Sequence, residues 1–357
     1  MAKSRERNHF ISRFLLRRFA SKVDAKRNKS WIWDIQKTGV TREISTKDAA
    51  VSSKFYGDRA TGIEDAFAIE EEKFSAALRA IDAGAPLSEH AATLSRLVWS
   101  QAARTRALRH SLAETMDAVF SAFTSSLDSA AATAAFKRMT KEELPRTIAD
   151  ELTKLPPDSR REAERRLEAM GGTEGAVQLA LSRIDSLEFA AFGVILNAMM
   201  KSEGFIDKAM ERGHVKGLSK LLIETPLDQP FKPDAWYLLE DPCASLVLGD
   251  VGVFAVAQEG TTSLVMRVSD AWREIYMPIS PTKALVGCKG TMRPSLSAQE
   301  VNRASASFSL ASIYAGRLTE SERQLIPLIG TRARFGDASD IQGIVDEVWR
   351  GPMKKER

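Results

Sequence analysis

EIYMPISPTKALVGC, residues 274–288, consists of two apolar runs, EIYMPIS and KALVGC, that meet at Pro281 and Thr282. Short runs of apolar and β-branched residues that are bounded by turn residues are typical of β-strands. Strands joined by so short a connection pair in the antiparallel sense, because a parallel pair needs a long crossover. The stretch therefore predicts two neighbouring strands of an antiparallel sheet.

Four more apolar runs precede this hairpin, separated by Gly, Asp, Pro or Thr: WYLLE (236–240), SLVLG (245–249), VGVFAVAQ (251–258) and TSLVMRV (262–268). They extend the prediction to five or six antiparallel strands within residues 231–318. A closing helix is predicted over 297–316, because Ser297 and Glu300 have the spacing of a capping box. We interpret residues 319–357 as a C-terminal extension.

Residues 61–230 have a different period. Ala, Glu, Leu and Arg are abundant there, and apolar residues recur at intervals of three and four, which predicts helices. Ser88 is expected to cap a long helix that reaches about residue 125. Residues 127–175 are the most charged and least apolar part of the chain, and they predict a peripheral helical hairpin.

The N-terminal segment, residues 1–60, contains a predicted helix over 8–20 and a predicted hairpin, in which WIWDI (31–35) and VTREIS (40–45) flank a turn. Strands thus lie toward both ends of the chain and helices in its middle. This segregation predicts an α+β fold, in which a largely helical middle region packs against an antiparallel sheet formed by the C-terminal strands. The N-terminal hairpin is expected to join or flank that sheet, in one integrated domain with a helical insertion.

Composition excludes several classes of protein. A hydrophobic content of 44% and a charged content of 27% are those of a soluble globular protein, and no apolar stretch approaches the roughly 20 residues that cross a bilayer. Cys243 and Cys288 have neither the spacing of zinc ligands nor that of a disulfide scaffold. The first residues do not lead into the apolar core of a signal peptide, so we expect a cytoplasmic protein without a membrane partner.

Positive charge is concentrated at the N-terminus. Residues 1–30 hold ten Lys or Arg against Glu6 and Asp24, an excess of +8, whereas the whole chain has a net charge of +4. The other residues therefore sum to −4. This asymmetry indicates that the N-terminal segment meets RNA, DNA, another anionic ligand or an acidic protein partner, unless it is a solvated basic arm.

The segment NHFISRFLLRRF, residues 8–19, carries much of this charge among apolar residues. On a helix, His9, Arg13 and Arg17 would form one stripe beside a buried apolar stripe. Like charges at this spacing repel each other, so a carboxylate from elsewhere in the chain or a bound phosphate is expected opposite them. His9 is the candidate acid or base, because Arg13 would keep its imidazole neutral near physiological pH.

Carboxylates could complete such a site. Glu64 and Glu71 lie seven residues apart on a predicted helix, and Glu64 with Glu70 or Glu71 could hold Mg²⁺, although the same residues could form a solvated face with ion pairs to the N-terminal arginines. Asp250 follows a predicted strand at a turn, where an aspartate either faces a ligand or binds nearby backbone amides. The sequence requires no cofactor, because the Walker A, GxGxxG, HExxH and GxSxG motifs are missing.

The predicted long helix carries two more arginines, Arg104 and Arg109, and the amide Gln101, which shares a face with Arg104. Guanidinium groups match the paired oxygens of phosphate or carboxylate, so these residues are candidates for anion binding. A set of buried ion pairs explains them nearly as well.

These motifs, taken in order, resemble the signature of the uncharacterised bacterial family called domain of unknown function 4238. The resemblance rests on Asn8, His9, Phe10, Phe14, Leu16, Arg17 and Phe19; on Trp31, Trp33 and Asp34; on Phe55 and Tyr56; on Gln101, Arg104, Thr105 and Arg109; on Leu248, Gly249 and Asp250; and on MPISP (277–281) with Val301 and Asn302. The chain departs from the pattern where proline is usual at Ser12 and Arg106, tyrosine at Leu15, and Asn-Pro at Val251 and Gly252. The resemblance implies a loose association with bacterial defence and no mechanism.

Three functions remain open from the sequence. The first is a nuclease-like effector, in which His9 is acid or base, Arg13, Arg17 and Arg104 hold phosphate, and Glu64, Glu71 and Asp250 orient water or metal. The second is a module that binds or senses nucleic acid or another anionic ligand without catalysis. The third is a structural interaction subunit with an Arg–Glu core.

Overall fold

The computed structural model describes residues 7–53, 55, 63–184, 193–195, 198, 212–213, 216, 232–264, 272–333, 341–343 and 345–346. The chain divides into two compact units. The first unit comprises Met1–Glu114 and Asp207–Phe335, and the second comprises Thr115–Ile206 and Gly336–Arg357.

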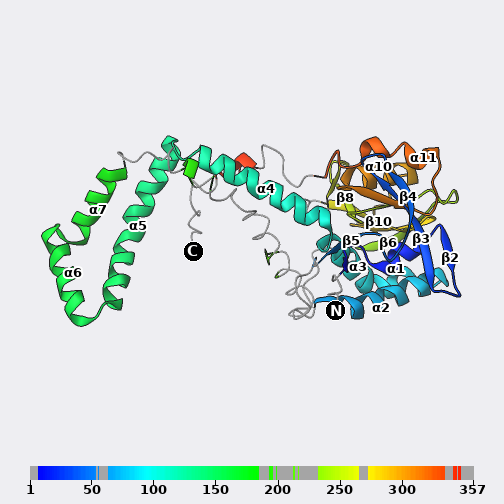
Figure 1. The fold of residues 1–357 in the computed structure, drawn as a ribbon, viewed down its shortest axis with the longest axis horizontal. Helices are drawn as coiled ribbons and strands as arrows, with labels where there is room; N and C mark the ends of the chain where they lie inside the picture. Colours follow the sequence, from blue (N-terminus) through cyan, green and yellow to red (C-terminus); the bar gives the residue numbers. More distant parts are fainter. Residues whose placement is uncertain are drawn as a thin grey trace, which may run out of the picture. The chain divides into compact units, whose positions relative to one another are not determined.

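A five-stranded antiparallel sheet lies at the centre of the first unit (Figure 1). Its strand order is β6-β11-β10-β8-β9, with bounds Ala235–Glu240, Lys283–Cys288, Trp272–Ser280, Phe254–Ala257 and Thr262–Leu264 in that order. The stretch 274–288 forms the β10–β11 hairpin, with Glu274 opposite Cys288 and Ser280 opposite Lys283. The hairpin predicted there is confirmed.

Helices cover both faces of this sheet. On one face, α2 (Ile63–Asp82) and α3 (Ala91–Ala103) pack through residues such as Leu78 and Val98 against Ile275 and Leu285. On the other face, α10 (Ala298–Phe308) packs through Val301 and Phe308 against Tyr276 and Val286. Because both faces are covered, consecutive residues of β10 are buried, which explains its continuous apolar sequence. The α+β class, with helices of the middle region packed on the C-terminal sheet, is confirmed.

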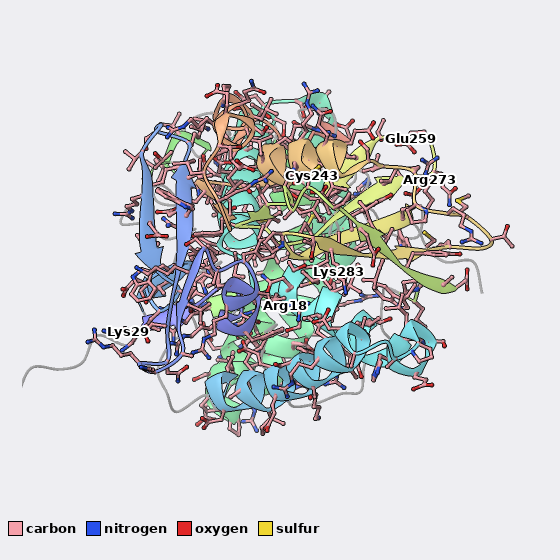
Figure 2. The ribbon with its side chains drawn as sticks, turned by 90° about the vertical axis from the view of Figure 1, so that its right-hand side faces the viewer. Arg18, Lys29, Cys243, Glu259, Arg273 and Lys283 are labelled. Carbon is pink, nitrogen blue, oxygen red and sulfur yellow. The ribbon has the colours of Figure 1, made fainter. Side chains whose placement is uncertain are left out.

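Ion pairs connect the layers at one edge. Asp82 ends α2 and binds Arg18 of α1 (Arg13–Arg18) at 2.7 Å and Lys283 of β11 at 3.2 Å. Arg18 also donates to the carbonyl oxygen of Ile279 at 2.8 Å. Figure 2 shows Arg18 and Lys283 on neighbouring elements above α2. The N-terminal helix is therefore fixed between the sheet and the helical layer.

The N-terminal hairpin belongs to a second antiparallel sheet. The order β2-β3-β12-β7 has bounds Lys22–Asp24, Lys29–Gln36, Ser312–Ala315 and Leu248–Gly249, and β4 (Thr41–Ser45) also pairs with β3. The predicted β3–β4 hairpin is confirmed. The hairpin joins C-terminal strands through β12, which lies in a stretch predicted to be helical. That helix, predicted to reach residue 316, ends at Phe308, after the capping box of Ser297 and Glu300 has formed as expected.

The N-terminal helix is shorter than predicted. Residues Arg7–His9 form strand β1, which pairs with β5 (Val51–Ser53), and the helix begins only at Arg13. The amide of Phe10 donates to the carbonyl of Ala50 at 3.0 Å. The prediction of a helix over 8–20 was wrong because a partner some forty residues away holds its first part extended. His9 therefore does not share a helical stripe with Arg13 and Arg17.

The long helix predicted from Ser88 to about 125 is interrupted. Residues Leu87–His90 form a 3₁₀ turn, α3 ends at Ala103, and α4 spans Arg106–Ser125. The hydroxyl of Thr105 accepts a hydrogen bond from the amide of Leu108 at 3.2 Å, so Thr105 caps the new helix. The break places Arg104 at the end of α3, where its side chain can turn toward the N-terminal segment.

Helices α5 (Ala130–Lys154), α6 (Pro157–Ala169) and α7 (Gly172–Ile184) belong to the second unit, and α7 packs back against α5. A Cβ at Gly175, in the first turn of α7, would lie 1.9 Å from the carbonyl oxygen of Met170, so this close approach of the backbone requires a glycine. Exposed pairs such as Arg160–Glu164 cover the surface of α6. Among the described residues, no helix is long and apolar enough to cross a membrane.

Candidate functional site

A buried guanidinium connects the N-terminal strand to the helical layer. Arg104 is 3% exposed, and its Nη1 donates to Ser12 Oγ at 2.9 Å and to Glu71 Oε1 at 2.5 Å. Its Nη2 donates to the carbonyl oxygen of His9 at 2.7 Å, and the group lies 4.3 Å from the ring centre of Phe67. Arg104 thus binds groups from β1, the start of α1 and α2 at once.

His9 lies beside this cluster. Burial and then the Arg104 guanidinium lower the pKa of its imidazole from 6.5 to about 4, and the Glu71 carboxylate only partly opposes them. The imidazole also forms a hydrogen bond with the backbone of Ala49. His9 is therefore neutral at physiological pH, as the sequence analysis expected, but a pKa near 4 makes it a weak proton acceptor there.

The two N-terminal arginines diverge. Arg13 is partly buried, contributes to the lowered pKa of His9, and has a buried Nε that lacks a hydrogen-bond partner among the described residues. Arg17 is exposed and binds Asn28, with its Nη2 donating to the backbone oxygen at 3.3 Å and to the side-chain oxygen. Only Arg13 therefore belongs to the His9 cluster.

The acidic residues of α2 have separate partners. Glu71 pairs with Arg104, whereas Glu70 pairs with Lys73 and Arg96, both at 2.9 Å. The side chain of Glu64 lies outside the described part of the structure. Within the described residues, no group of three or more His, Cys, Asp or Glu could hold a metal ion.

Gln101 and Arg109 bind protein backbone. Gln101 is 1% exposed and donates through Nε2 to the carbonyl oxygen of Phe10 at 3.3 Å. Arg109 donates to the carbonyl oxygen of Phe55 and stacks on that ring, 4.0 Å from its centre. The structural alternative for these residues was a set of buried ion pairs. Arg104 does form one, with Glu71, whereas Gln101 and Arg109 bind backbone carbonyls.

Asp250 is the centre of a neighbouring polar cluster. Its buried carboxylate accepts hydrogen bonds from the amides of Leu310 (2.7 Å), Ala311 (2.8 Å) and Ser312 (3.1 Å). Burial raises its pKa from 3.8 to about 6, although the three amides act in the opposite direction. The carboxylate therefore holds the chain where it enters β12. It binds backbone amides, but these lie 60 to 62 residues away in the sequence, whereas the local alternative expected them within its own turn.

The Asp250 turn reaches the first cluster through Gly252. A Cβ at Gly252 would lie 2.7 Å from Cγ of Gln101, and its φ of +73° is closed to proline, the residue usual at this place in the family pattern. The predicted residues His9, Arg13, Glu71, Gln101 and Arg104 and the Asp250 turn thus lie in one region. Arg17 lies apart from it, and Arg109 is directed to Phe55.

Sequence reasoning missed several polar residues of this region. Ser12 binds Arg104, and Tyr314 is buried near Asp250 and Asp34, so that burial and then the Asp250 carboxylate raise the pKa of its phenol. The serine at position 12, where proline is usual in the family pattern, was a signal that could have identified Ser12. Tyr314 lies in the short strand β12, whose four residues carry no periodicity strong enough to identify it.

A basic surface lies at the edge of the second sheet. We call β2, β3, the turn that connects them and Arg17 the basic hairpin. It carries five exposed cations: Arg17, Lys22, Lys26, Arg27 and Lys29. Lys22 Nζ lies 5.5 Å from the ring centre of Trp31, and Arg27 is 4.0 Å from Asp24. Figure 2 shows Lys29 at the periphery of the molecule, beside the blue strands.

The family described as "Protein of unknown function (DUF4238)" matches residues 7–324. No curated protein and no solved structure matches the chain. The family match covers both clusters and the basic hairpin, and it spans far more than half of the sequence. The chain therefore belongs to the DUF4238 family.

Proposed function

We propose that this protein binds RNA or DNA through the basic hairpin. The main support comes from comparing the buried charges of the interior with the exposed cations of the hairpin. Arg104 and Glu71 pair with each other in the interior, whereas the cations of the basic hairpin are exposed. Arg27 has only a long contact to Asp24 at 4.0 Å, which is worth little at an exposed site.

Exposed cations attract the phosphate backbone regardless of base sequence, because binding releases condensed counterions. Trp31 adds a second element of recognition. It is only partly buried, lies on the surface of β3, and has Lys22 across its face. An aromatic ring next to cations suits the stacking of an unpaired base, so single-stranded nucleic acid is the preferred form of the ligand.

Removing three hairpin charges should weaken binding and reduce its dependence on salt. For Lys26→Gln/Arg27→Gln/Lys29→Gln we expect the slope of log K against log salt to become shallower by about 2, since each lost contact to a single strand contributes roughly 0.7. Fluorescence anisotropy with a labelled single-stranded RNA, a single-stranded DNA and a duplex would measure this between about 50 and 200 mM salt.

A matched control is available on α6. Arg160→Gln/Arg165→Gln/Arg166→Gln removes the same charge from exposed residues of the second unit, whose side chains are 46%, 75% and 76% exposed. This variant should bind like the wild type. Equal losses in the two triple variants would mean that net charge, and not the hairpin, determines binding.

Phosphodiester hydrolysis is the second candidate function, and with it a role as an effector in bacterial defence. The charges of Arg13, Glu71 and Arg104 all act on the His9 imidazole, and this convergence favours hydrolysis. A phosphate placed against Arg13 would supply the anion that the partly buried guanidinium accommodates, and its charge would raise the pKa of His9 toward neutrality. Mg²⁺ remains a candidate cofactor in this proposal.

Cleavage should depend on His9 and Arg13. We expect His9→Asn to slow the cleavage of labelled RNA or DNA by about 10²- to 10⁴-fold, the usual range for loss of an acid or base. Arg13→Gln removes a charge that would stabilise the phosphate and should slow cleavage by about 10²- to 10³-fold. The assay would be run with Mg²⁺ and with a chelator. His110→Asn is the control, because His110 is 48% exposed and pairs with Glu114 on α4. If the wild type cleaves nothing yet binds, the binding function stands alone.

A further inference from the structure

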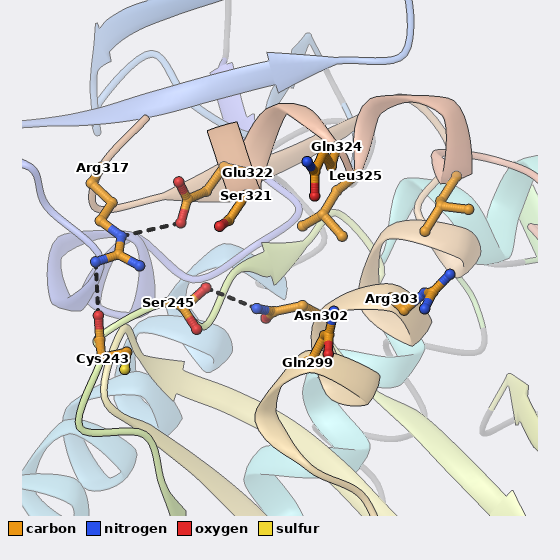
Figure 3. Close-up of a pocket in the computed structure, with 11 residues that line it drawn as sticks. Cys243, Ser245, Gln299, Asn302, Arg303, Arg317, Ser321, Glu322, Gln324 and Leu325 are labelled. Atoms are coloured by element: carbon orange, nitrogen blue, oxygen red, sulfur yellow. Dashed lines mark hydrogen bonds and ion pairs between the residues drawn. The ribbon is translucent and has the colours of Figure 1, made fainter. Parts of the chain in front are cut away.

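A pocket lined by polar, charged and apolar side chains lies elsewhere in the first unit. Its volume is about 670 Å³, and it lies between α10, the short helix α11 (Glu320–Arg323) with the residues that follow it, and the loop after β6 (Figure 3). This size falls within the range of small-molecule sites in proteins. None of the residues proposed above for nucleic-acid binding or hydrolysis lines it.

One wall carries a guanidinium in a fixed position. Arg317 donates through Nε to Glu322 Oε1 at 3.1 Å and through Nη1 to the carbonyl oxygen of Cys243 at 2.8 Å. Glu322 cannot easily follow a moving partner, because its side chain is 2% exposed and its other oxygen accepts from the amide and hydroxyl of Thr319. Figure 3 shows the remaining terminal nitrogen of Arg317 on the side of the pocket where Ser245 lies.

The loop after β6 is also held in place. Asn302 of α10 accepts from the amide of Val247 at 2.9 Å and donates to the carbonyl oxygen of Ser245 at 2.9 Å. Asp241 accepts from the amide and the hydroxyl of Ser245, each at 2.6 Å. The loop contains Ala244 with φ +50°, an uncommon conformation for a residue with a side chain. The wall is therefore organised before any ligand arrives.

The facing wall offers groups that are not used in such contacts. Gln299 and Arg303 lie one turn apart on α10 and are both exposed, and Figure 3 shows Arg303 across the pocket from Arg317. Leu325 and Leu328 add an apolar surface. The lining thus combines two cations with one carboxylate, Glu322, whose oxygens are already engaged. The groups left for a ligand are hydrogen-bond donors, amides and an apolar area.

We infer that this pocket binds a small organic oxyanion, a molecule of about nucleotide size that carries a phosphate or carboxylate group. The oxyanion would sit on the terminal nitrogen of Arg317 that is not engaged by Glu322 or Cys243, because a guanidinium held in one orientation loses little conformational entropy when it binds an anion. Arg303 would close over it from the facing wall, and the body of the ligand would lie against Leu325 and Leu328. This inference does not depend on the proposed nucleic-acid binding or hydrolysis.

Binding would be measured by isothermal titration calorimetry with adenosine monophosphate, inorganic phosphate and citrate as probes. These probes separate a phosphate ester, a bare anion and a carboxylate. We expect at least one of the organic probes to bind, and to bind about tenfold or more weakly to Arg303→Gln and to Arg317→Lys, which keeps the charge but loses the fork. Arg323→Gln on α11 is the control, because Arg323 is exposed and does not line the pocket.

A thiol provides an independent readout. Cys243 is exposed and lines the pocket, whereas Cys288 is buried. A bound probe should slow the alkylation of Cys243 by a maleimide, and Cys243→Ser should bind the probe without being labelled at that position. The inference is overturned if neither organic probe binds the wild type, if Arg303→Gln and Arg317→Lys both bind like the control, or if a saturating probe leaves Cys243 labelling unchanged.

Discussion

Replacing Arg104 with methionine is expected to lower the free energy of unfolding by about 3–5 kcal/mol, the usual effect of removing one partner from a buried ion pair. The substitution leaves Glu71 without its charge partner and leaves the carbonyl of His9 and the hydroxyl of Ser12 without a donor. Methionine fills much of the same space, so the loss reports on the polar contacts more than on a cavity. Denaturant unfolding followed by circular dichroism would measure it.

Arg96→Met is the matched control. Arg96 lies on the same helix and also pairs with a glutamate of α2, Glu70, at 2.9 Å, but its side chain is 40% exposed. Because Arg96 itself is exposed and Glu70 keeps Lys73 at 2.9 Å, the loss of Arg96 should cost only about 0–1 kcal/mol. If Arg104→Met costs no more than Arg96→Met, the buried cluster does not hold the N-terminal strand. In a double-mutant cycle, Glu71→Gln should cost less in the Arg104→Met background than in the wild type.

Much of the architecture could be predicted because it is encoded locally. The runs that became β6 to β11 are short, apolar and bounded by turn residues, and the capping box of Ser297 and Glu300 marks the start of α10. The WIWDI and VTREIS segments pair as β3 and β4. Each of these signals lies within about ten residues of sequence, where period and turn chemistry are informative.

The errors occurred where distant contacts decide the local structure. Strand β1 is extended because of β5, and β12 replaces the end of a predicted helix because Asp250 binds the amides of residues 310–312. Neither partner can be inferred from the periodicity of the segment itself. The break at Arg104 and Thr105 has a local cause instead, because the hydroxyl of Thr105 caps α4 within a pattern that continues on both sides.

The candidate site was predicted in its composition more than in its geometry. His9, Arg13 and Glu71 do lie near one another, but Arg104, not an N-terminal arginine, is the partner of Glu71. The pocket beside α10 could not have been predicted, because its walls come from three segments between residues 243 and 328 that share no motif. Residue types indicate which chemistry is available, whereas the folded chain decides which groups are already satisfied.

Asp250→Ala is expected to destabilise the protein by about 3–5 kcal/mol, because three backbone amides would lose their acceptor and each unsatisfied buried donor costs roughly 1–3 kcal/mol. The amides belong to Leu310, Ala311 and Ser312, so the entry into β12 and its pairing with β3 should weaken together. Hydrogen exchange of the β12 amides would locate the effect. An alanine variant as stable as the wild type, with protected β12 amides, would show that water replaces the carboxylate at no cost.

Asp250→Asn separates the hydrogen bonds from the charge. In the wild type, burial raises the pKa of Asp250 from 3.8 to about 6. Between these two pH values the folded state therefore holds a proton on Asp250 that the unfolded state lacks. Asp250 therefore adds stability as the pH falls from 6 to 4, up to about 3 kcal/mol at 1.36 kcal/mol per unit. His9 acts in the opposite direction. Its pKa is lowered from 6.5 to about 4, so between these pH values the unfolded state binds a proton that the folded state lacks. The wild type should thus show little net change from this pair, whereas Asp250→Asn should lose stability as the pH falls from 6.5 to 4. Parallel pH profiles of the two proteins would contradict this account of the buried carboxylate.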